Sequence, residues 1–256
     1  MKMAVFLLLS LLFPAGIVSA TEFALQRPLV LGQSCALSGP AKNLGSEMRA
    51  GLLAAFSRVN DSGGIKGREV LMMSRDDGYE PDKAVRNTKG LIYDDQVFAL
   101  IGAVGTPTSK AAVPIAVEAR IPFFGPFTGA EFLRSPHQRY VVNVRASYFQ
   151  EMESLASYLV EKRGIRKIAC FYQNDSYGYS GLRGIEQALA RRGITLVSKG
   201  SYERNTVAVM GALRDIYAAK PEAVVMAGAY SGCAEFIKLS VKKIKEKMLF
   251  CNISFV

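Results

Sequence analysis

Hydroxyl residues cluster in residues 102–109, directly after an apolar, strand-like run. This segment contains Thr106, Thr108 and Ser109, and an amphipathic stretch follows. Thr106 is suited to cap a helix, and Pro107 is suited to the first helical position. A helix start offers unpaired backbone N–H groups and a positive dipole end, so the segment is suited to binding a carboxylate or another anion. Ordinary helix capping explains the same residues equally well.

Other loops with glycine and polar or aromatic side chains also follow strand-like runs. They comprise residues 38–45, 125–130, 174–179 and 228–232. Ligands of open parallel sheets bind outside the carboxyl ends of the strands, so these loops are candidate ligand-binding segments. Tyr177 and Tyr230 could cover a ligand held by the earlier loops, although a single tyrosine is more often a packing residue.

Catalytic motifs are poorly represented. Ser231 is not central between two glycines, as a nucleophile elbow requires, and the single histidine, His137, lies in a segment with surface-loop composition. No P-loop pattern occurs. Residues 76–82 are acidic but lack the spacing of a calcium loop, and they suit the approach to a helix N-terminus. We therefore expect no enzyme and no cofactor. An α/β-hydrolase-like enzyme that uses Ser231 and His137 is a minor alternative.

Cysteine and charge content indicate no metal, redox or nucleic-acid site. Cys35, Cys170, Cys233 and Cys251 form no CxxC pair, and buried free thiols are common in strand-like runs. The net charge of +10 is spread along the chain, with its densest run at residues 242–247. A solvated helix face explains this run better than a nucleic-acid patch does.

The first residues have the pattern of a secretory signal. Lys2 precedes an apolar run, and Ser19 and Ala20 belong to a small-residue cleavage site, so residues 1–20 are predicted to be removed after Ala20. An uncleaved anchor is the alternative, but the run is shorter than the ~20 residues that span a bilayer. Pro14 also interrupts it. The expected product is periplasmic.

Short apolar runs alternate with amphipathic helices along the rest of the chain, which predicts an α/β fold with parallel sheets covered on both faces. We expect two doubly wound lobes, residues 21–145 and 146–256, joined by a strand at 140–145. The second lobe is expected to be incomplete, because residues 248–256 read as a strand without a following helix. Pro114 should kink or split its helix. The expected strands are 29–36, 69–75, 98–101, 122–125, 140–145, 167–172, 195–202, 223–227 and 248–256, and the expected helices are 46–60, 81–93, 106–119, 149–163, 179–192, 207–219 and 231–245.

An ordered series of motifs resembles the periplasmic receptors of branched-chain amino acid ABC transporters, which are type I, leucine-binding-protein-like periplasmic binding proteins. The motifs are QSCALSGP at 33–40, NDSGGIKGR at 60–68, RDDGYEP at 75–81 and IPFFGP at 121–126, together with the hydroxyl segment described above. The resemblance implies a Venus-flytrap fold, in which two lobes close on a small solute.

The resemblance also implies a set of ligand-binding residues. In the family, the segments matching residues 106–109 and 127–129 hold the ligand carboxylate, the residue matching Leu44 lies above the ligand, and two aromatic residues of the second lobe cover it. The acidic residue that pairs with the ligand ammonium usually follows the strand matching 248–256. A disulfide found in some relatives would join loops that contain no cysteine here. The predicted site residues are Leu44, Thr106, Thr108, Ser109, Phe127, Thr128, Gly129, Tyr177 and Tyr230.

These features together predict a monomeric extracytoplasmic receptor. It would deliver an amino acid or a related small carboxylate or amide to an ABC permease complex in the membrane, and it would bind no nucleic acid. Two alternatives remain open. The chain could serve as a sensory or regulatory ligand-binding module, or it could be a nonfunctional truncated fragment of such a receptor.

Overall fold

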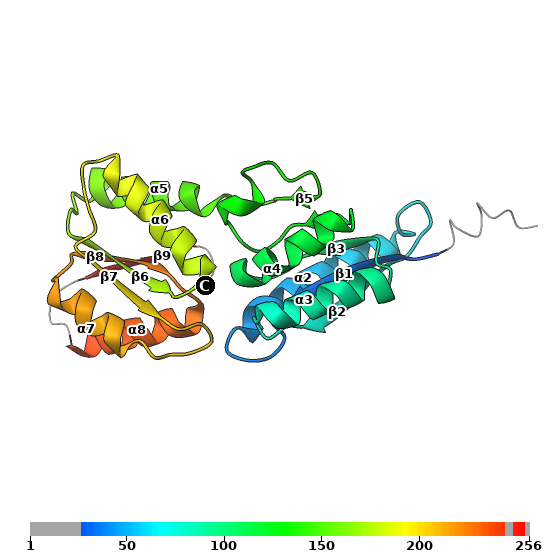
Figure 1. Cartoon of the computed structure of the whole chain (residues 1–256), viewed down its shortest axis with the longest axis horizontal. Coiled ribbons are helices and arrows are strands. Elements are labelled where there is room, and N and C mark those ends of the chain that lie inside the picture. The colour runs from blue at the N-terminus through cyan, green and yellow to red at the C-terminus, as the bar shows by residue number, and fades with distance from the viewer. Residues whose placement is uncertain (1–26, 244–247, 254–256) are drawn as a thin grey trace, which may run out of the picture.

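The computed structural model describes residues 27–243 and 248–253, which form two α/β lobes side by side (Figure 1). The predicted signal segment and cleavage point lie outside the described residues. The first lobe consists of β1 (Leu29–Cys35), α2 (Lys42–Asp61), β2 (Val70–Asp76), α3 (Pro81–Lys89), β3 (Ala99–Ile101), α4 (Thr106–Glu118), β4 (Phe123–Phe124) and β5 (Val141–Val142). The second consists of α5 (Tyr148–Ser157), β6 (Ile168–Gln173), α6 (Ser176–Ala190), β7 (Ser198–Tyr202), α7 (Met210–Ala218), β8 (Ala223–Ala227), α8 (Tyr230–Lys243) and β9 (Leu249–Asn252).

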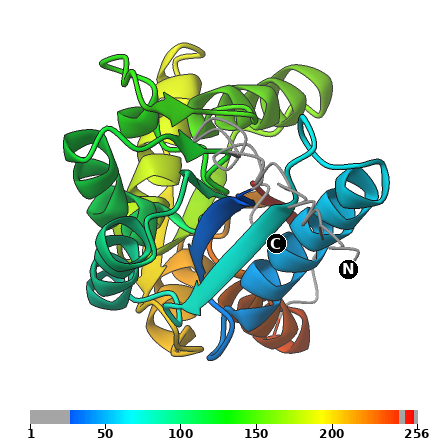
Figure 2. The same ribbon diagram turned by 90° about the vertical axis from the view of Figure 1, so that its right-hand side faces the viewer.

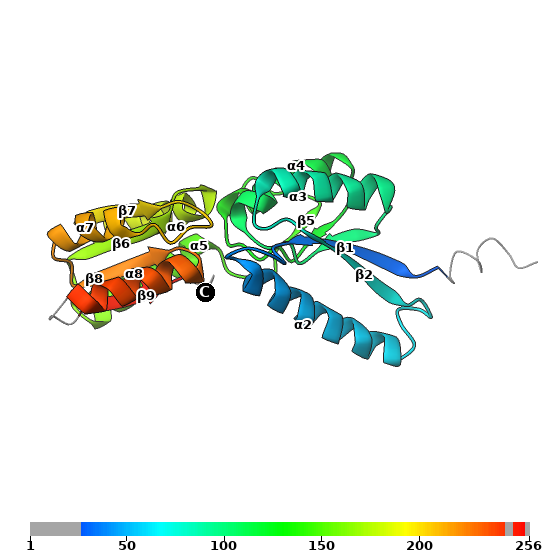
Figure 3. The same cartoon turned by 90° about the horizontal axis from the view of Figure 1, so that it is seen from below.

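Both sheets are parallel, and their strand orders correspond. The first sheet has the order β2-β1-β3-β4-β5, and the second has β7-β6-β8-β9, so the second repeats the order of the first four strands. In the first lobe α2 covers one face of the sheet, and α3 and α4 cover the other (Figures 2 and 3). Helices α5 and α6 lie on one side of the second sheet, and α7 and α8 lie on the other (Figure 1). The predicted fold class of two parallel-sheet lobes is confirmed.

The hydrophobic core explains why these runs form strands. All five residues of β8 are buried, as expected for a central parallel strand covered on both faces. One buried cluster continues from the first lobe, with Tyr79 and Val104, into the second, with Tyr148, Met152 and Tyr177. The lobes are therefore packed against each other in this structure.

Several predicted helix boundaries are wrong. Helix α4 is not split but runs through Pro114. The proline lacks a backbone N–H and so removes one internal hydrogen bond, but the helix does not end there. Gly105, with φ of +106°, precedes α4, so Thr106 is its first residue rather than its cap. Helix α6 begins at Ser176 because the Asp175 carboxylate accepts hydrogen bonds from two backbone N–H groups of its first turn.

Other expected features are reduced or shifted. The predicted strand at 140–145 is only the two-residue β5, which pairs with β4 in the first sheet. Helices α2 and α8 begin earlier than predicted, at Lys42 and Tyr230. All four cysteines are free thiols, and three of them are buried. Within the described ranges, no helix is long and apolar enough to span a bilayer.

Candidate ligand-binding site

The carboxyl ends of the central strands place the predicted loops at the junction of the lobes. The Tyr230 hydroxyl, at the start of α8, donates a hydrogen bond to the carbonyl of Pro40, which follows β1. Asn205, which follows β7, donates to the carbonyl of Gly78, which follows β2. Loops that are far apart in the sequence are thus in direct contact across the junction.

A buried hydroxyl pair forms the inner part of the site. The Thr106 and Thr128 hydroxyl oxygens are 2.7 Å apart, and the Tyr148 hydroxyl lies 3.3 Å from that of Thr106. The ring of Tyr177 lies 5.3 Å from that of Tyr148, centroid to centroid. All four residues are fully buried. The structure therefore brings three predicted residues together around Tyr148, which the sequence did not single out.

Three further predicted residues line an open cleft of about 400 Å³. Leu44 and Phe127 belong to the first lobe, and Tyr230 belongs to the second. The remaining lining residues, all from α2, are Asn43, Glu47 and Met48. The cleft adjoins the hydroxyl pair in sequence, because Phe127 precedes Thr128. Its walls are mainly apolar, with one carboxylate at the edge.

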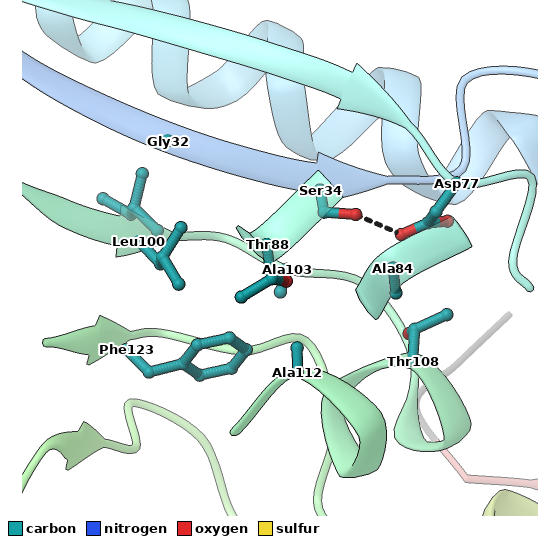
Figure 4. A pocket seen from close by; sticks show the side chains of 11 residues that line it. Gly32, Ser34, Asp77, Ala84, Thr88, Leu100, Ala103, Thr108, Ala112 and Phe123 are labelled. Carbon is teal, nitrogen blue, oxygen red and sulfur yellow. Dashed lines mark hydrogen bonds between the residues drawn. The ribbon is translucent and has the colours of Figure 1, made fainter. Parts of the chain in front are cut away.

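Thr108 and Gly129 make local contacts within the protein, whereas the buried Ser109 hydroxyl makes no hydrogen bond within the described ranges. The Thr108 hydroxyl donates to the Val104 carbonyl at 2.6 Å, and its side chain lines a small internal cavity of about 10 Å³ within the first lobe (Figure 4). The Ser109 hydroxyl is buried and has no hydrogen-bond partner among the described residues. Gly129 approaches the backbone of Tyr148 so closely that a Cβ would lie 2.8 Å from its nitrogen. Their contacts with a ligand remain predictions.

A second polar cluster, centred on Gln173, was not predicted from the sequence. The Gln173 amide donates to Asp175 at 2.6 Å and to the Tyr79 hydroxyl at 3.4 Å. The Tyr202 hydroxyl donates to the side-chain amide oxygen (Oε1) of Gln173 at 3.2 Å and accepts from the Ala229 backbone N–H at 2.8 Å. A glutamine at the end of an apolar strand was the available signal, since a buried amide requires partners.

Burial dominates the electrostatics of this cluster. It raises the pKa of Tyr79 and of Tyr202, which keeps both hydroxyls protonated and able to donate. Burial also raises the pKa of Asp175, although hydrogen bonds from Gln173 and from the first turn of α6 oppose this shift. The junction is therefore rich in neutral hydrogen-bonding groups and contains one buried carboxyl.

No candidate metal centre appears in the described part of the chain. Groups of three or more His, Cys, Asp or Glu side chains that could hold a metal ion do not occur among the described residues. His137 is an exposed residue of the first lobe, whereas Ser231 belongs to α8 in the second. The two residues of the hydrolase alternative therefore lie in different lobes.

A family model described as periplasmic binding protein matches residues 28–240, and the chain belongs to this family. Leu/Ile/Val-binding protein homolog 7 of Brucella abortus (strain 2308) is 27% identical over 216 residues, which cover 81% of this chain and 54% of that protein. The Leu/Ile/Val/Thr-binding protein of Salmonella typhimurium is 25% identical over 162 residues, which cover 63% of this chain and 44% of that protein. The chain thus spans about half the length of the curated relatives it matches.

Solved structures agree with this assignment. A possible leucine/isoleucine/valine-binding protein from Rhodopirellula baltica SH 1 is 39% identical with a TM-score of 0.85, covering 90% of this chain and 63% of that one. A substrate-binding periplasmic protein from Ralstonia solanacearum is 28% identical with a TM-score of 0.84, covering 89% of this chain and 64% of that one. Both the fold and the class of solute-binding protein are therefore shown.

Proposed function

We propose that this chain is the binding part of a periplasmic receptor that delivers an amino acid, or a related small carboxylate or amide, to an ABC transporter. The observation that carries the proposal is the buried Thr106–Thr128 hydroxyl pair at the start of α4, together with a cleft lined by both lobes whose residue Phe127 precedes Thr128 in the chain. Hydroxyl donors at the positive end of a helix suit a carboxylate.

The cleft supports a ligand with an apolar body. Leu44, Met48 and Phe127 present apolar side chains to the cleft, and Tyr230 lines it from the second lobe. A small aliphatic amino acid combines a carboxylate for the hydroxyls with an apolar group for these walls. The names of the relatives, which refer to leucine, isoleucine and valine, agree with this chemistry.

Closure of the lobes provides the mechanism. A ligand that touches the first lobe through Thr106 and Thr128, and the second through Tyr177 and Tyr230, binds the closed arrangement better than the open one. Its binding therefore shifts the equilibrium towards closure. Closure excludes water from the carboxylate, which strengthens its hydrogen bonds with the hydroxyls.

The transport role predicts the chain's partners. A monomeric receptor exported through cleavage after Ala20 would meet a permease at the membrane. Genes for a permease and an ATPase beside the coding gene would support delivery. A neighbouring kinase or regulator gene without a permease would instead favour the sensory role.

A thermal-shift screen of the purified chain tests ligand binding. The panel contains the natural L-amino acids, their amides and small aromatic acids. We expect at least one small apolar amino acid or amide to raise the melting temperature with increasing concentration, because a ligand specific for the folded state stabilises it. If a folded chain shows no stabilisation by any member of the panel, the proposed binding function is wrong.

A further inference from the structure

We propose that Glu80, Asp175, Arg204 and Asn205 form an interlobe clasp that positions the two lobes in the closed arrangement and sets the strength of ligand retention. The role in ligand retention rests on the proposed receptor function. The clasp itself concerns residues outside the Thr106–Thr128 pair and outside the cleft beside it.

The clasp joins one carboxylate of the first lobe to two side chains of the second. Arg204 donates through Nη2 to Glu80 Oε2 at 2.7 Å, and Asn205 donates through Nδ2 to Glu80 Oε1 at 2.7 Å. The Asn205 amide also donates to the Gly78 carbonyl at 3.1 Å. Both oxygens of Glu80 are therefore held by the other lobe, an arrangement that fixes orientation as well as distance.

A carboxylate of the second lobe completes the network. Asp175 Oδ2 lies 3.5 Å from Nη1 of Arg204, so the guanidinium stands between a carboxylate of its own lobe and one of the other lobe. The Arg204 side chain is 23% exposed and that of Asp175 is 9% exposed. Solvent screens the Arg204–Asp175 pair less than it screens a fully exposed surface pair, whereas the Glu80 side chain, 41% exposed, is screened more strongly.

A backbone conformation with positive φ occurs at the clasp residue Asn205 and at Tyr79, which precedes the clasp residue Glu80. Asn205 has φ of +59° and Tyr79 has φ of +65°, and side chains other than glycine rarely occupy this region. The Tyr79 backbone N–H donates to Asp77 at 2.8 Å, which helps to hold the turn. The Tyr79 hydroxyl in turn accepts from Gln173 of the second lobe. These two positive-φ positions lie on opposite sides of the lobe junction.

The geometry predicts unequal effects for the two charged partners. Glu80→Ala removes the Arg204–Glu80 and Asn205–Glu80 contacts between the lobes but leaves Arg204 beside Asp175. Arg204→Ala removes the cation and leaves Glu80 and Asp175 as like charges without their shared partner. Arg204→Ala should therefore open the lobes further than Glu80→Ala does.

The test measures the distance between fluorophores placed on exposed positions of the two lobes, in the full chain without added ligand. Arg214→Ala is the matched control, because Arg214 is 79% exposed and pairs only locally, with Asp215. We expect both clasp variants to lengthen the distance, Arg204→Ala more so, while Arg214→Ala leaves it unchanged.

Glu80→Gln keeps the shape of the side chain and protects the test against misfolding of the alanine variants. Added salt should open the wild-type lobes but have less effect on Glu80→Gln. With a ligand from the thermal-shift screen, Glu80→Ala should bind roughly fivefold more weakly, mainly through faster dissociation. Folded variants with the wild-type distance would overturn the clasp. The distance measurement needs no ligand, so a chain that binds nothing in the screen still tests the clasp separately.

Discussion

At the lobe junction, the contacts and burial of single residues determine their chemical role, and residue type alone does not reveal them. Threonines 106 and 128 were selected from their loops, and the structure places their hydroxyls in contact. Tyr79 lies in an acidic loop whose residues suit a helix start and match a family motif, and its side chain is fully buried at the junction. The sequence shows where polar residues follow strands, but it does not show which of them face the other lobe.

Asp77 is the clearest case of a buried ionisable group in the first lobe. Its carboxylate accepts hydrogen bonds from the Ser34 hydroxyl at 2.8 Å and from the Tyr79 backbone at 2.8 Å, beside the internal cavity (Figure 4). Burial nevertheless raises the pKa of Asp77 from 3.8 to about 6. The folded protein therefore binds this proton more tightly than the unfolded chain does.

This pKa shift predicts a pH dependence of stability. The contribution of Asp77 is fully present below its unfolded pKa and is lost as pH rises through about 6, because the ionised form is disfavoured by burial. The shift corresponds to a loss on the order of 3 kcal/mol. Asp77→Asn has no carboxyl group to ionise at this position and should lose this pH dependence. The free energy of unfolding, measured with urea at about pH 4 and pH 7, should therefore fall less with rising pH in the variant than in the wild type.

Asp76→Asn provides the control with the opposite sign. Although burial raises the pKa of Asp76, hydrogen bonds from the Ser38 hydroxyl and from backbone N–H groups lower it below the ordinary value. Asp76 therefore contributes stability that is present above its ordinary pKa and lost in acid. An identical pH dependence in wild type and Asp77→Asn would contradict the assignment of the decline to Asp77.

At the scale of elements, each lobe has a glycine near the start of a helix that packs closely against the backbone at the end of the preceding strand. A Cβ on Gly45 in α2 would lie 1.9 Å from the Ala36 carbonyl oxygen, and a Cβ on Gly178 in α6 would lie 1.9 Å from the Gln173 carbonyl oxygen. Glycine thus allows each helix to begin directly against the strand that precedes it. This contact positions the loop after β1 and the loop after β6 at the lobe junction.

Gly178→Ala should consequently destabilise the chain by more than about 2 kcal/mol, because the added methyl group meets backbone atoms that cannot move independently. Gly211→Ala in α7 is the matched control. A Cβ there meets nothing within 4 Å, and alanine favours a helix by up to about 1 kcal/mol. Urea unfolding measures both. Equal free energies of unfolding for the two variants would show that the contact between Gly178 and the Gln173 backbone does not require glycine.

Most elements were predictable, and the differences have local physical causes. Apolar periodicity located the strands and helices, whereas helix starts depended on caps that only geometry reveals. Asp175 was read as a loop residue, but its carboxylate accepts from the Tyr177 and Gly178 N–H groups and starts α6 earlier. Pro114 was expected to kink or split α4. The helix is not split, and its residues Val113 and Ala116 are buried in the core.

At the scale of the whole molecule, contacts between the lobes could not be derived from the sequence. Glu80 and Arg204 are separated by 124 positions, and Tyr230 and Pro40 by 190. No periodicity or local motif encodes such pairs, because they depend on how two separate sheets come together. The family resemblance did predict two lobes with a shared site, and the structure adds the contacts that join them.

Calorimetric titration of the ligand found by thermal shift gives the most direct test of the central claim, that a small carboxylate or amide binds at the Thr106–Thr128 pair. We expect saturable one-site binding to the wild-type chain. Thr128→Val, which replaces the hydroxyl with a methyl group, should bind the ligand at least about tenfold more weakly than the wild type does. Gly211→Ala should bind as the wild type does. The account would be contradicted by equal affinity of folded Thr128→Val and wild type, or by no binding heat from a folded wild-type chain.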